Sequence, residues 1–517
     1  MNAIKKQFFR AAKASRLGAE PQKENPHQSE RKRTWSVFLG FVLLAASAAQ
    51  GQYSVTISGG AVTIDRYTGS GGAVAIPATI SNLPVTTIGL EAFYGNTNVT
   101  SVTMPNSVTS IQYDAFEYCS SLASVILSTN LTAILDEAFS TCGLTSITIP
   151  SSVTNIANGV FGGSTNLSAI DVEAQNPVYS SVNGVLFNQN QTTLVDYAGT
   201  GGSYTIPGGV TTIGVEAFLD SSLTNVTIPA SVTSIGEQAF AGATLASVTI
   251  PVSVTSIGED AFAQCYSLRS VTIPRSVTSI GLGAFSDCSS LAGITIPSSV
   301  TNIGLEAFLG CSSLTAFVVS AQNSFYSSTN GVLFNKNQTS LIAYPCAISG
   351  SYTVPGGVTS IETYAFFDCT SLAGVTIPGS VTNIGEDAFY YCPSLTNVFF
   401  TGNAPSVDSS VFLSDNDATV YYLPGATGWI SPFGGLPALL WNPLIQASGA
   451  SFGVRSNQFG FNVNWASGQV IVVEVSTNLA NPVWAPLQTN TLTNGSFYFS
   501  EPVQTNGSGR FYRISSP

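Results

Sequence analysis

The stretch Leu291-Ala-Gly-Ile-Thr-Ile-Pro-Ser-Ser-Val-Thr-Asn-Ile-Gly-Leu-Glu-Ala-Phe308 decides the fold of this 517-residue chain. Apolar and polar residues alternate over Ile294–Ile296, as they do in a β-strand with one buried face. Pro297 cannot donate a backbone hydrogen bond and therefore ends the strand. A second pair of apolar residues follows, and Phe308 then places a ring in the interior.

The same pattern recurs along the chain and ends each time in a phenylalanine: Phe93, Phe116, Phe139, Phe161, Phe218, Phe240, Phe262, Phe285, Phe308, Phe366, Phe389 and Phe412. Most of these residues are 22 or 23 positions apart. One repeat cannot bury its apolar side chains alone, whereas stacked repeats bury them on both sides, at about 1.5–3 kcal/mol per large side chain. The sequence predicts a mainly β fold, a curved parallel solenoid of about twelve repeats.

Two steps between phenylalanines are much longer, from Phe161 to Phe218 and from Phe308 to Phe366. Both contain Asn-Gly-Val-Leu-Phe-Asn, starting at Asn183 and at Asn330. Because the two segments are alike, a block of several repeats has been duplicated. We expect each to form a hairpin-like excursion from the solenoid, at about residues 172–210 and 319–358.

The motif Ile-Pro-x-Ser-Val-Thr-x-Ile-Gly-x-x-Ala-Phe-x-x-Cys-x-Ser-Leu, present from Ile273 to Leu291, resembles the BspA-like leucine-rich-repeat family of bacterial surface and secreted proteins. The resemblance covers about residues 53–443. It implies a curved parallel leucine-rich-repeat solenoid and a role in adhesion or recognition, and it supplies no catalytic motif. Pro-x-Ser-Val replaces the Asn or Cys that follows the strand in standard leucine-rich repeats.

The two ends of the chain break the repeat. Residues 1–49 combine a long basic region, a short apolar run and small residues before Gln50, which is typical of a secretory signal peptide. We therefore expect a secreted or cell-surface protein with no membrane span after signal removal, and a solenoid over 50–443. Residues 444–517 hold short alternating strands separated by Asn-Gly and Gly-Ser turns, which predicts a small C-terminal β-sandwich module, serving as a cap or as an attachment tag.

Charge and histidine content exclude several classes of function. Residues 1–34 carry nine basic residues, and the rest of the chain carries seven basic and 25 acidic residues. Such an acidic body is repelled by nucleic acid. The single histidine is His27, so the processed chain has no imidazole for a catalytic triad or a metal site. We predict no cofactor, no metal, no catalytic residue and no enzyme activity.

Carboxylates nevertheless recur at one position of the repeat, two residues before the phenylalanine. This acidic stripe comprises Glu91, Asp114, Glu137, Glu216, Asp260, Glu306 and Asp387. It is interpreted as a solvated edge that keeps the protein soluble. Weak cation binding, or a carboxylate pair for glycosidic cleavage, is the alternative.

Seven cysteines share another repeat position: Cys119, Cys142, Cys265, Cys288, Cys311, Cys369 and Cys392. Cys346 lies in the second excursion. The spacing within clusters brings thiols of neighbouring turns close, so an exported protein could oxidise them. We expect buried free thiols, because a free cysteine packs as a small apolar residue.

The outward-facing strand positions form a third set, the outward strand row, which comprises Thr103, Ile126, Thr148, Asp171, Thr227, Thr249, Thr272, Thr295, Val318, Thr376 and Phe399. Thr227, Thr249, Thr272 and Thr295 are the candidate ligand-binding residues. Their hydroxyl groups suit an extracellular protein or a glycan, bound weakly at each site and strengthened by repetition. High β-propensity on a solvated strand also accounts for threonine here. The function predicted is a recognition or adhesion solenoid; the alternatives are a structural spacer or surface-layer component without a specific ligand and, more distantly, a carboxylate-based carbohydrate-active enzyme.

Overall fold

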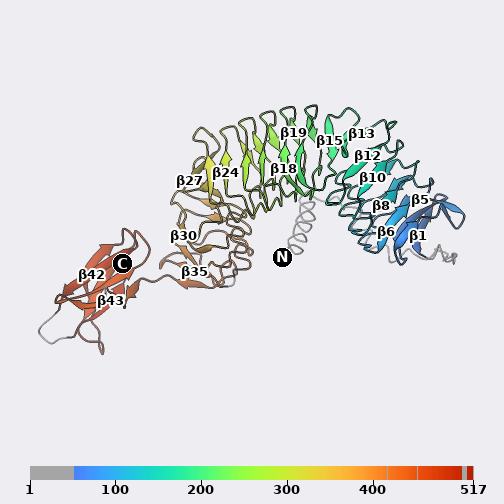
Figure 1. The fold of residues 1–517 in the computed structure, drawn as a ribbon. Helices are drawn as coiled ribbons and strands as arrows, with labels where there is room; N and C mark the ends of the chain where they lie inside the picture. The colour runs from blue at the N-terminus through green and yellow to red at the C-terminus, as the bar shows by residue number, and fades with distance from the viewer. Residues whose placement is uncertain (1–51, 416, 451, 504–508, 516–517) are drawn as a thin grey trace.

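The computed structural model describes residues 52–415, 417–450, 452–503 and 509–515, so the expected signal peptide lies outside the described residues. All regular elements in the described part are strands, which stack into a long arch (Figure 1). The fold is the predicted parallel leucine-rich-repeat solenoid. None of the described segments forms a helix long and apolar enough to cross a membrane.

Each turn of the solenoid places one longer strand on the same side. These strands are β3 (Gly72–Ala75), β6 (Val99–Thr103), β8 (Ser124–Ile126), β10 (Ser146–Ile149), β12 (Ala169–Val172), β16 (Gly202–Thr205), β18 (Leu223–Thr227), β20 (Ser247–Thr249), β22 (Ser270–Thr272), β24 (Gly293–Ile296), β26 (Ala316–Val319), β30 (Gly350–Thr353), β32 (Leu372–Ile377), β34 (Asn397–Phe400), β35 (Thr419–Tyr422) and β36 (Ala438–Leu440). The longer strands pair in parallel in groups of two to five, and equivalent repeat positions are register partners in β20 and β22, in β24 and β26, and in β32 and β34. The turns of β12, β26, β35 and β36 lack a repeat phenylalanine.

The isoleucine of the second apolar pair of each repeat lies in a two-residue strand. These are β7 (Ser110–Ile111), β9 (Ala133–Ile134), β11 (Asn155–Ile156), β17 (Thr212–Ile213), β19 (Ser234–Ile235), β21 (Ser256–Ile257), β23 (Ser279–Ile280), β25 (Asn302–Ile303), β31 (Ser360–Ile361) and β33 (Asn383–Ile384). At the start of the solenoid, β1 (Tyr53–Ser58), β2 (Ala61–Tyr67), β4 (Thr79–Ile80) and β5 (Leu83–Ile88) lead into this second ladder.

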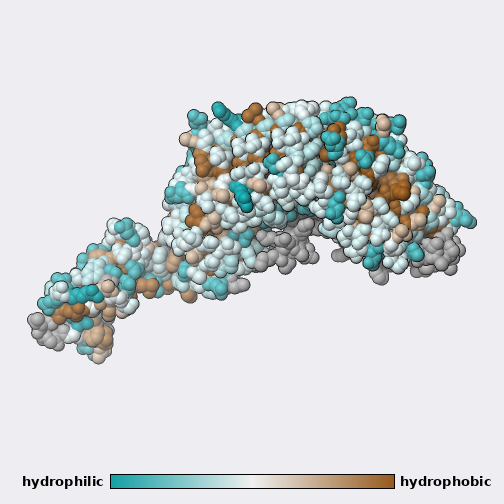
Figure 2. Space-filling model, in the orientation of Figure 1, coloured by the Kyte–Doolittle hydropathy of each residue, from teal (hydrophilic) through white to brown (hydrophobic). Residues whose placement is uncertain are grey.

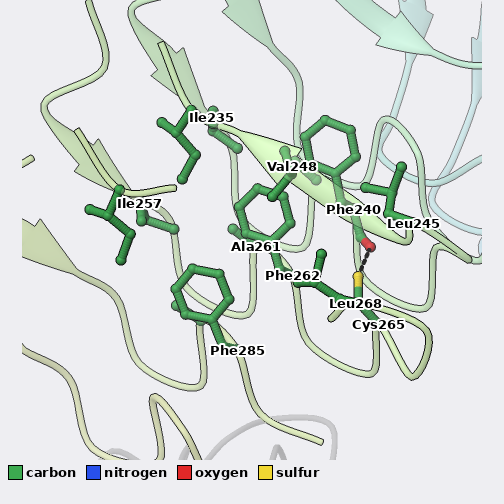
Figure 3. Close-up of a cluster of buried hydrophobic side chains, with 14 of the residues drawn as sticks. Ile235, Phe240, Leu245, Val248, Ile257, Ala261, Phe262, Cys265, Leu268 and Phe285 are labelled. Atoms are coloured by element: carbon green, nitrogen blue, oxygen red, sulfur yellow. Dashed lines mark hydrogen bonds between the residues drawn. The ribbon is translucent and has the colours of Figure 1, made fainter. Parts of the chain in front are cut away.

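The repeat phenylalanines form the core and a third ladder. The N–H of Phe285 donates to the carbonyl of Ala307 in the next turn at 2.9 Å, and the same bond recurs at most turns. Neighbouring rings stack, with centroids 5.4 Å apart for Phe262 and Phe285 and 5.8 Å apart for Phe285 and Phe308. Figure 3 shows three successive rings, Phe240, Phe262 and Phe285, one above the other.

Each excursion is a three-stranded antiparallel unit that rejoins the solenoid. The first contains β13 (Tyr179–Val182), β14 (Val185–Asn188) and β15 (Thr193–Asp196), and the second contains β27 (Tyr326–Thr329), β28 (Val332–Asn335) and β29 (Ser340–Ala343). The last strand of each unit pairs in parallel with the next two-residue strand. The excursions therefore replace a turn of the solenoid, and each begins a new ladder of two-residue strands.

The C-terminal strands form two antiparallel sheets around a core of their own. They are β37 (Leu444–Gln446), β38 (Gly453–Arg455), β39 (Gln458–Asn464), β40 (Val470–Ser476), β41 (Ala485–Thr491), β42 (Ser496–Pro502) and β43 (Phe511–Ser515). The core includes Leu423 of the solenoid, and the indole N–H of Trp465 donates to the carbonyl of Trp441 at 2.8 Å. These contacts join the sandwich to the end of the solenoid.

Candidate functional site

The four candidate threonines all lie exposed on the outward face of the longer strands. Thr249 and Thr272 are direct register partners in β20 and β22, and Thr295 follows in β24 between the buried Ile294 and Ile296. The alternation predicted from the sequence thus places the hydroxyl groups outward. Apolar neighbours hold the strands in the core, and the threonines add little to that packing.

The threonine side chains are available to a ligand. No hydrogen bond of their hydroxyl groups to another protein group occurs within the described residues, whereas the backbone groups are used: Ile250 N–H donates to the Thr272 carbonyl at 3.2 Å. Ser247 and Ser270 flank the threonines in the same register and are exposed. The face seen in Figure 2 is mostly pale, with hydrophobic side chains in separate small patches. Strands β18 to β24 therefore present exposed hydroxyl groups at equivalent positions of successive turns.

The outward strand row ends in aromatic residues, which the sequence reasoning did not group together. Phe399 of β34 is the register partner of Tyr421 of β35, and their ring centroids are 5.2 Å apart. The Trp441 ring lies 4.4 Å from that of Phe399. All three are half-buried. In the sequence, Tyr421 occupies the position that threonine has in other turns. Its turn lacks the repeat phenylalanine by which the other turns were aligned, so Tyr421 was not assigned to the outward strand row.

The acidic stripe differs from the solvated edge that the sequence suggested. Asp260 is only 3% exposed and Glu216 8%, although Glu91 is exposed. The backbone at this position is left-handed, with φ of 49° at Asp260 and 60° at Glu306. The solvated interpretation is therefore wrong for Asp260 and Glu216, because glycines in the facing turns, Gly283 and Gly159, leave room for these two carboxylates between the stacked turns.

Another buried carboxylate stands where the first excursion rejoins the solenoid. Asp196 is 3% exposed and accepts a hydrogen bond from the N–H of Phe161 at 3.2 Å. The pKa of Asp196 is raised to about 8: burial is the main cause, the charge of nearby Glu216 adds to it, and hydrogen bonds from the N–H groups of Phe161 and Tyr197 oppose the shift. At most turns the N–H of the repeat phenylalanine donates to an alanine carbonyl of the next turn, whereas at Phe161 the carboxyl group of Asp196 accepts instead. The role of Asp196 is therefore structural.

One further acidic cluster involves two neighbouring turns. Ligand oxygens of Asp114, Glu117 and Glu137 all lie within 4.8 Å of one another. No metal site was expected from the sequence. The cluster arises because the repeat aligns the acidic stripe of two turns beside the buried Glu117. Carboxylates at this distance can share one cation, but such clusters are also common without an ion.

Six of the eight cysteines are free and buried, as expected: Cys119, Cys142, Cys265, Cys288, Cys311 and Cys392. The thiol of Cys265 donates to the carbonyl of Phe240 at 3.1 Å (Figure 3), and Ser164 makes the same bond to Phe139 at 2.9 Å. The expectation is wrong for Cys346 and Cys369, which form a disulfide. The excursion places Cys346 beside the next turn, a position that no regular repeat provides.

Comparisons with known proteins agree with this architecture. The profile of the BspA type Leucine rich repeat region (6 copies) matches residues 86–198, 202–336 and 343–429. A leucine rich cell surface protein from Faecalibacterium prausnitzii A2-165 is 25% identical, over 74% of this chain and 90% of its own, with a TM-score of 0.34. A leucine-rich repeat protein from Eubacterium ventriosum is 25% identical, over 68% of this chain and 95% of its own, with a TM-score of 0.44.

No curated protein matches the chain. The profile match covers more than half of the chain, and its three segments follow the stacked turns and both excursions. The chain belongs to the BspA-type leucine-rich-repeat family.

Proposed function

We propose that this protein is an exported, non-catalytic recognition solenoid that binds an extracellular protein or a glycan through the outward face of its longer strands. The observation that carries the proposal is the set of exposed threonines on successive strands, whose hydroxyl groups make no hydrogen bond to another group of the described residues. The face is polar and rigid, so each contact is weak and repetition supplies affinity.

Two further observations support this assignment. The aromatic group Phe399, Tyr421 and Trp441 provides the kind of side chain that dominates binding energy at interfaces. A bacterial cell surface protein is among the structures to which the chain is similar, and the basic and apolar order of residues 1–49 agrees with export.

The test is a screen followed by a triple substitution. The full chain is screened against arrays of glycans and extracellular proteins. Thr249, Thr272 and Thr295 are then changed together to arginine. The triple variant should keep its circular dichroism spectrum, because exposed positions tolerate substitution, and should lose at least about tenfold in affinity through bulk and charge at three adjacent sites.

The matched control changes three exposed residues away from the outward strand row, Thr255, Thr278 and Thr301, to arginine. This control should bind as the wild type does. Equal affinity of a folded Thr249, Thr272 and Thr295 variant would place the binding surface elsewhere. The absence of any ligand would favour a spacer role.

A further inference from the structure

The two excursions rejoin the solenoid in different ways, although their sequences are related. We call the place where an excursion rejoins the solenoid a junction. At the first junction, the Phe161 turn contacts the Phe218 turn: Gly163 N–H donates to the Leu219 carbonyl at 3.0 Å. A Cβ atom at Gly162 would lie 2.9 Å from Cδ2 of Leu219, and one at Gly159 would lie 2.3 Å from Oε2 of Glu216. The close approach of the two turns therefore depends on both glycines.

The second junction carries larger residues at the same positions. Glu306 stands where the first junction has Gly159, and Leu309 stands where it has Gly162. Their side chains prevent the same approach, and among the described residues no carbonyl accepts from the N–H of Gly310 as that of Leu219 does from Gly163. A cavity of about 300 Å³ lies here between the Phe308 turn and the Phe366 turn. This volume is at the lower end of ligand pockets, which are about 300–1,000 Å³.

The cavity also contains an unused hydrogen-bond donor. Phe161 N–H at the first junction is satisfied by Asp196, but Ala343 replaces that aspartate at the second. Phe308 N–H has no acceptor among the residues that the structure describes. Both Phe308 and Ala343 line the cavity. A buried N–H group without a partner costs free energy, so a ligand oxygen at this point is favoured.

The cavity also offers a hydrogen-bond acceptor, the carboxylate of Glu362. Glu362 replaces Gly214 of the first junction, and its Oε1 accepts hydrogen bonds from Ser360 Oγ at 2.8 Å and from Ser340 Oγ. These two hydroxyl groups hold the carboxylate in place, which leaves Oε2 to accept from a ligand. Of the described residues, no lysine, arginine or histidine lines the cavity, whereas Glu306 and Glu362 both do, so anions are disfavoured.

Aromatic side chains complete the wall. Tyr364 and Phe367 meet edge to face, with ring centroids 5.7 Å apart, and Tyr326 and Tyr344 also line the cavity. Tyr364 replaces Glu216 and Phe367 replaces Leu219 of the first junction. Aromatic rings present apolar faces together with polar hydroxyl groups, and they lose little conformational entropy on binding.

We propose that the cavity between the Phe308 and Phe366 turns binds a neutral pyranose unit of a glycan. A sugar hydroxyl both accepts from an N–H such as that of Phe308 and donates to a carboxylate such as that of Glu362, and the sugar ring packs on Tyr364 and Phe367. The first junction is closed by Asp196, Glu216 and Leu219 and does not bind. This site is separate from the outward strand row.

The test uses saturation-transfer NMR on the full chain with methyl glycosides of glucose, galactose, mannose and N-acetylglucosamine. At least one glycoside should bind. Ala343→Asp supplies the carboxylate that closes the first junction, so it should pair with Phe308 N–H and reduce the affinity at least tenfold. Ala292→Asp adds the same charge at an exposed position outside the cavity and should leave binding unchanged.

A second variant keeps the proposal falsifiable if Ala343→Asp does not fold. Tyr364→Ala removes a half-buried ring from the wall and should also reduce the affinity at least tenfold. The proposal is overturned if no glycoside binds, if binding persists in both variants, or if tetramethylammonium binds in place of the sugars. The triple arginine variant of the outward strand row should retain glycoside binding here, which separates this test from that of the proposed function.

Discussion

The phenylalanine ladder shows how one residue type serves neighbouring turns at once. Phe285 is fully buried and stacks on a ring on either side, so each turn supplies half of the surroundings of the next ring. Burial of an aromatic side chain removes about 150–250 Å² from water. The stability of a turn therefore depends on its neighbours as much as on its own sequence.

Phe285→Ala should lower the free energy of unfolding by about 3–5 kcal/mol, because it removes a buried ring and leaves a cavity. Urea denaturation followed by circular dichroism measures this loss. Tyr266→Ala removes a 40% exposed ring from a neighbouring turn and should cost less than half as much. An equal cost for both would show that the ring stack is not the main source of stability.

Asp196 should make stability depend on pH. Burial raises its pKa to about 8 in the folded chain, while the unfolded value is that of an ordinary aspartate. Between these two values the folded state binds the extra proton, so this residue's contribution to stability falls as pH rises, by at most about 1.4 kcal/mol per pH unit.

Asp196→Asn should remove this slope. Melting temperatures of wild type and variant, measured from pH 5 to pH 9, should show a smaller fall for the variant. Parallel curves would mean that the carboxyl group is charged throughout.

The structural unit of this fold is one turn of the solenoid, and strand pairing between turns fixes the number of residues in it. Equivalent residues pair in register on both strand ladders, as Ser279 does with Ser256 and with Asn302. A turn of constant length therefore returns every side chain to the same face. The excursions keep this rule, because each rejoins a ladder with its last strand.

Deletion of residues 263–285 removes one whole repeat. It joins Phe262 to Ser286, the residue that follows the repeat phenylalanine Phe285 in the intact chain. The shortened solenoid should fold, with its melting temperature lowered by less than about 10 °C, because each turn contacts only its neighbours. Deletion of residues 263–273 removes about half a repeat and should abolish cooperative unfolding, since it places buried residues outside. Circular dichroism melting distinguishes the two. Failure of the whole-repeat deletion to fold would show that turns are not interchangeable.

At the scale of the whole molecule, the core of the solenoid consists of three hydrophobic clusters rather than one. The first runs from Val62 to Ala198, the second from Val185 to Leu333 and the third from Val332 to Ala438. Their boundaries fall at the two excursions, where the stack of phenylalanine rings is interrupted. The excursions therefore divide the arch into three segments that share few buried contacts.

This division predicts local rather than global damage. In Phe285→Ala, hydrogen exchange measured by mass spectrometry should increase in the middle cluster and remain near wild type in the cluster ending at Ala198. The equivalent substitution Phe116→Ala should reverse the pattern. A uniform increase over the whole chain in either variant would indicate a single cooperative unit.

The sequence by itself determined the repeat, the inward and outward faces and the family, because the period and the strand alternation are local properties of about 23 residues. It also placed the four threonines outward and most thiols inside. Only the tertiary structure decided the partial burial of the acidic stripe, since a carboxylate is buried where a glycine of a neighbouring turn faces it, as Gly283 faces Asp260 and Gly159 faces Glu216. The Cys346–Cys369 disulfide and the cavity at the second junction likewise depend on how an excursion meets the next turn, and no spacing within one repeat encodes that contact.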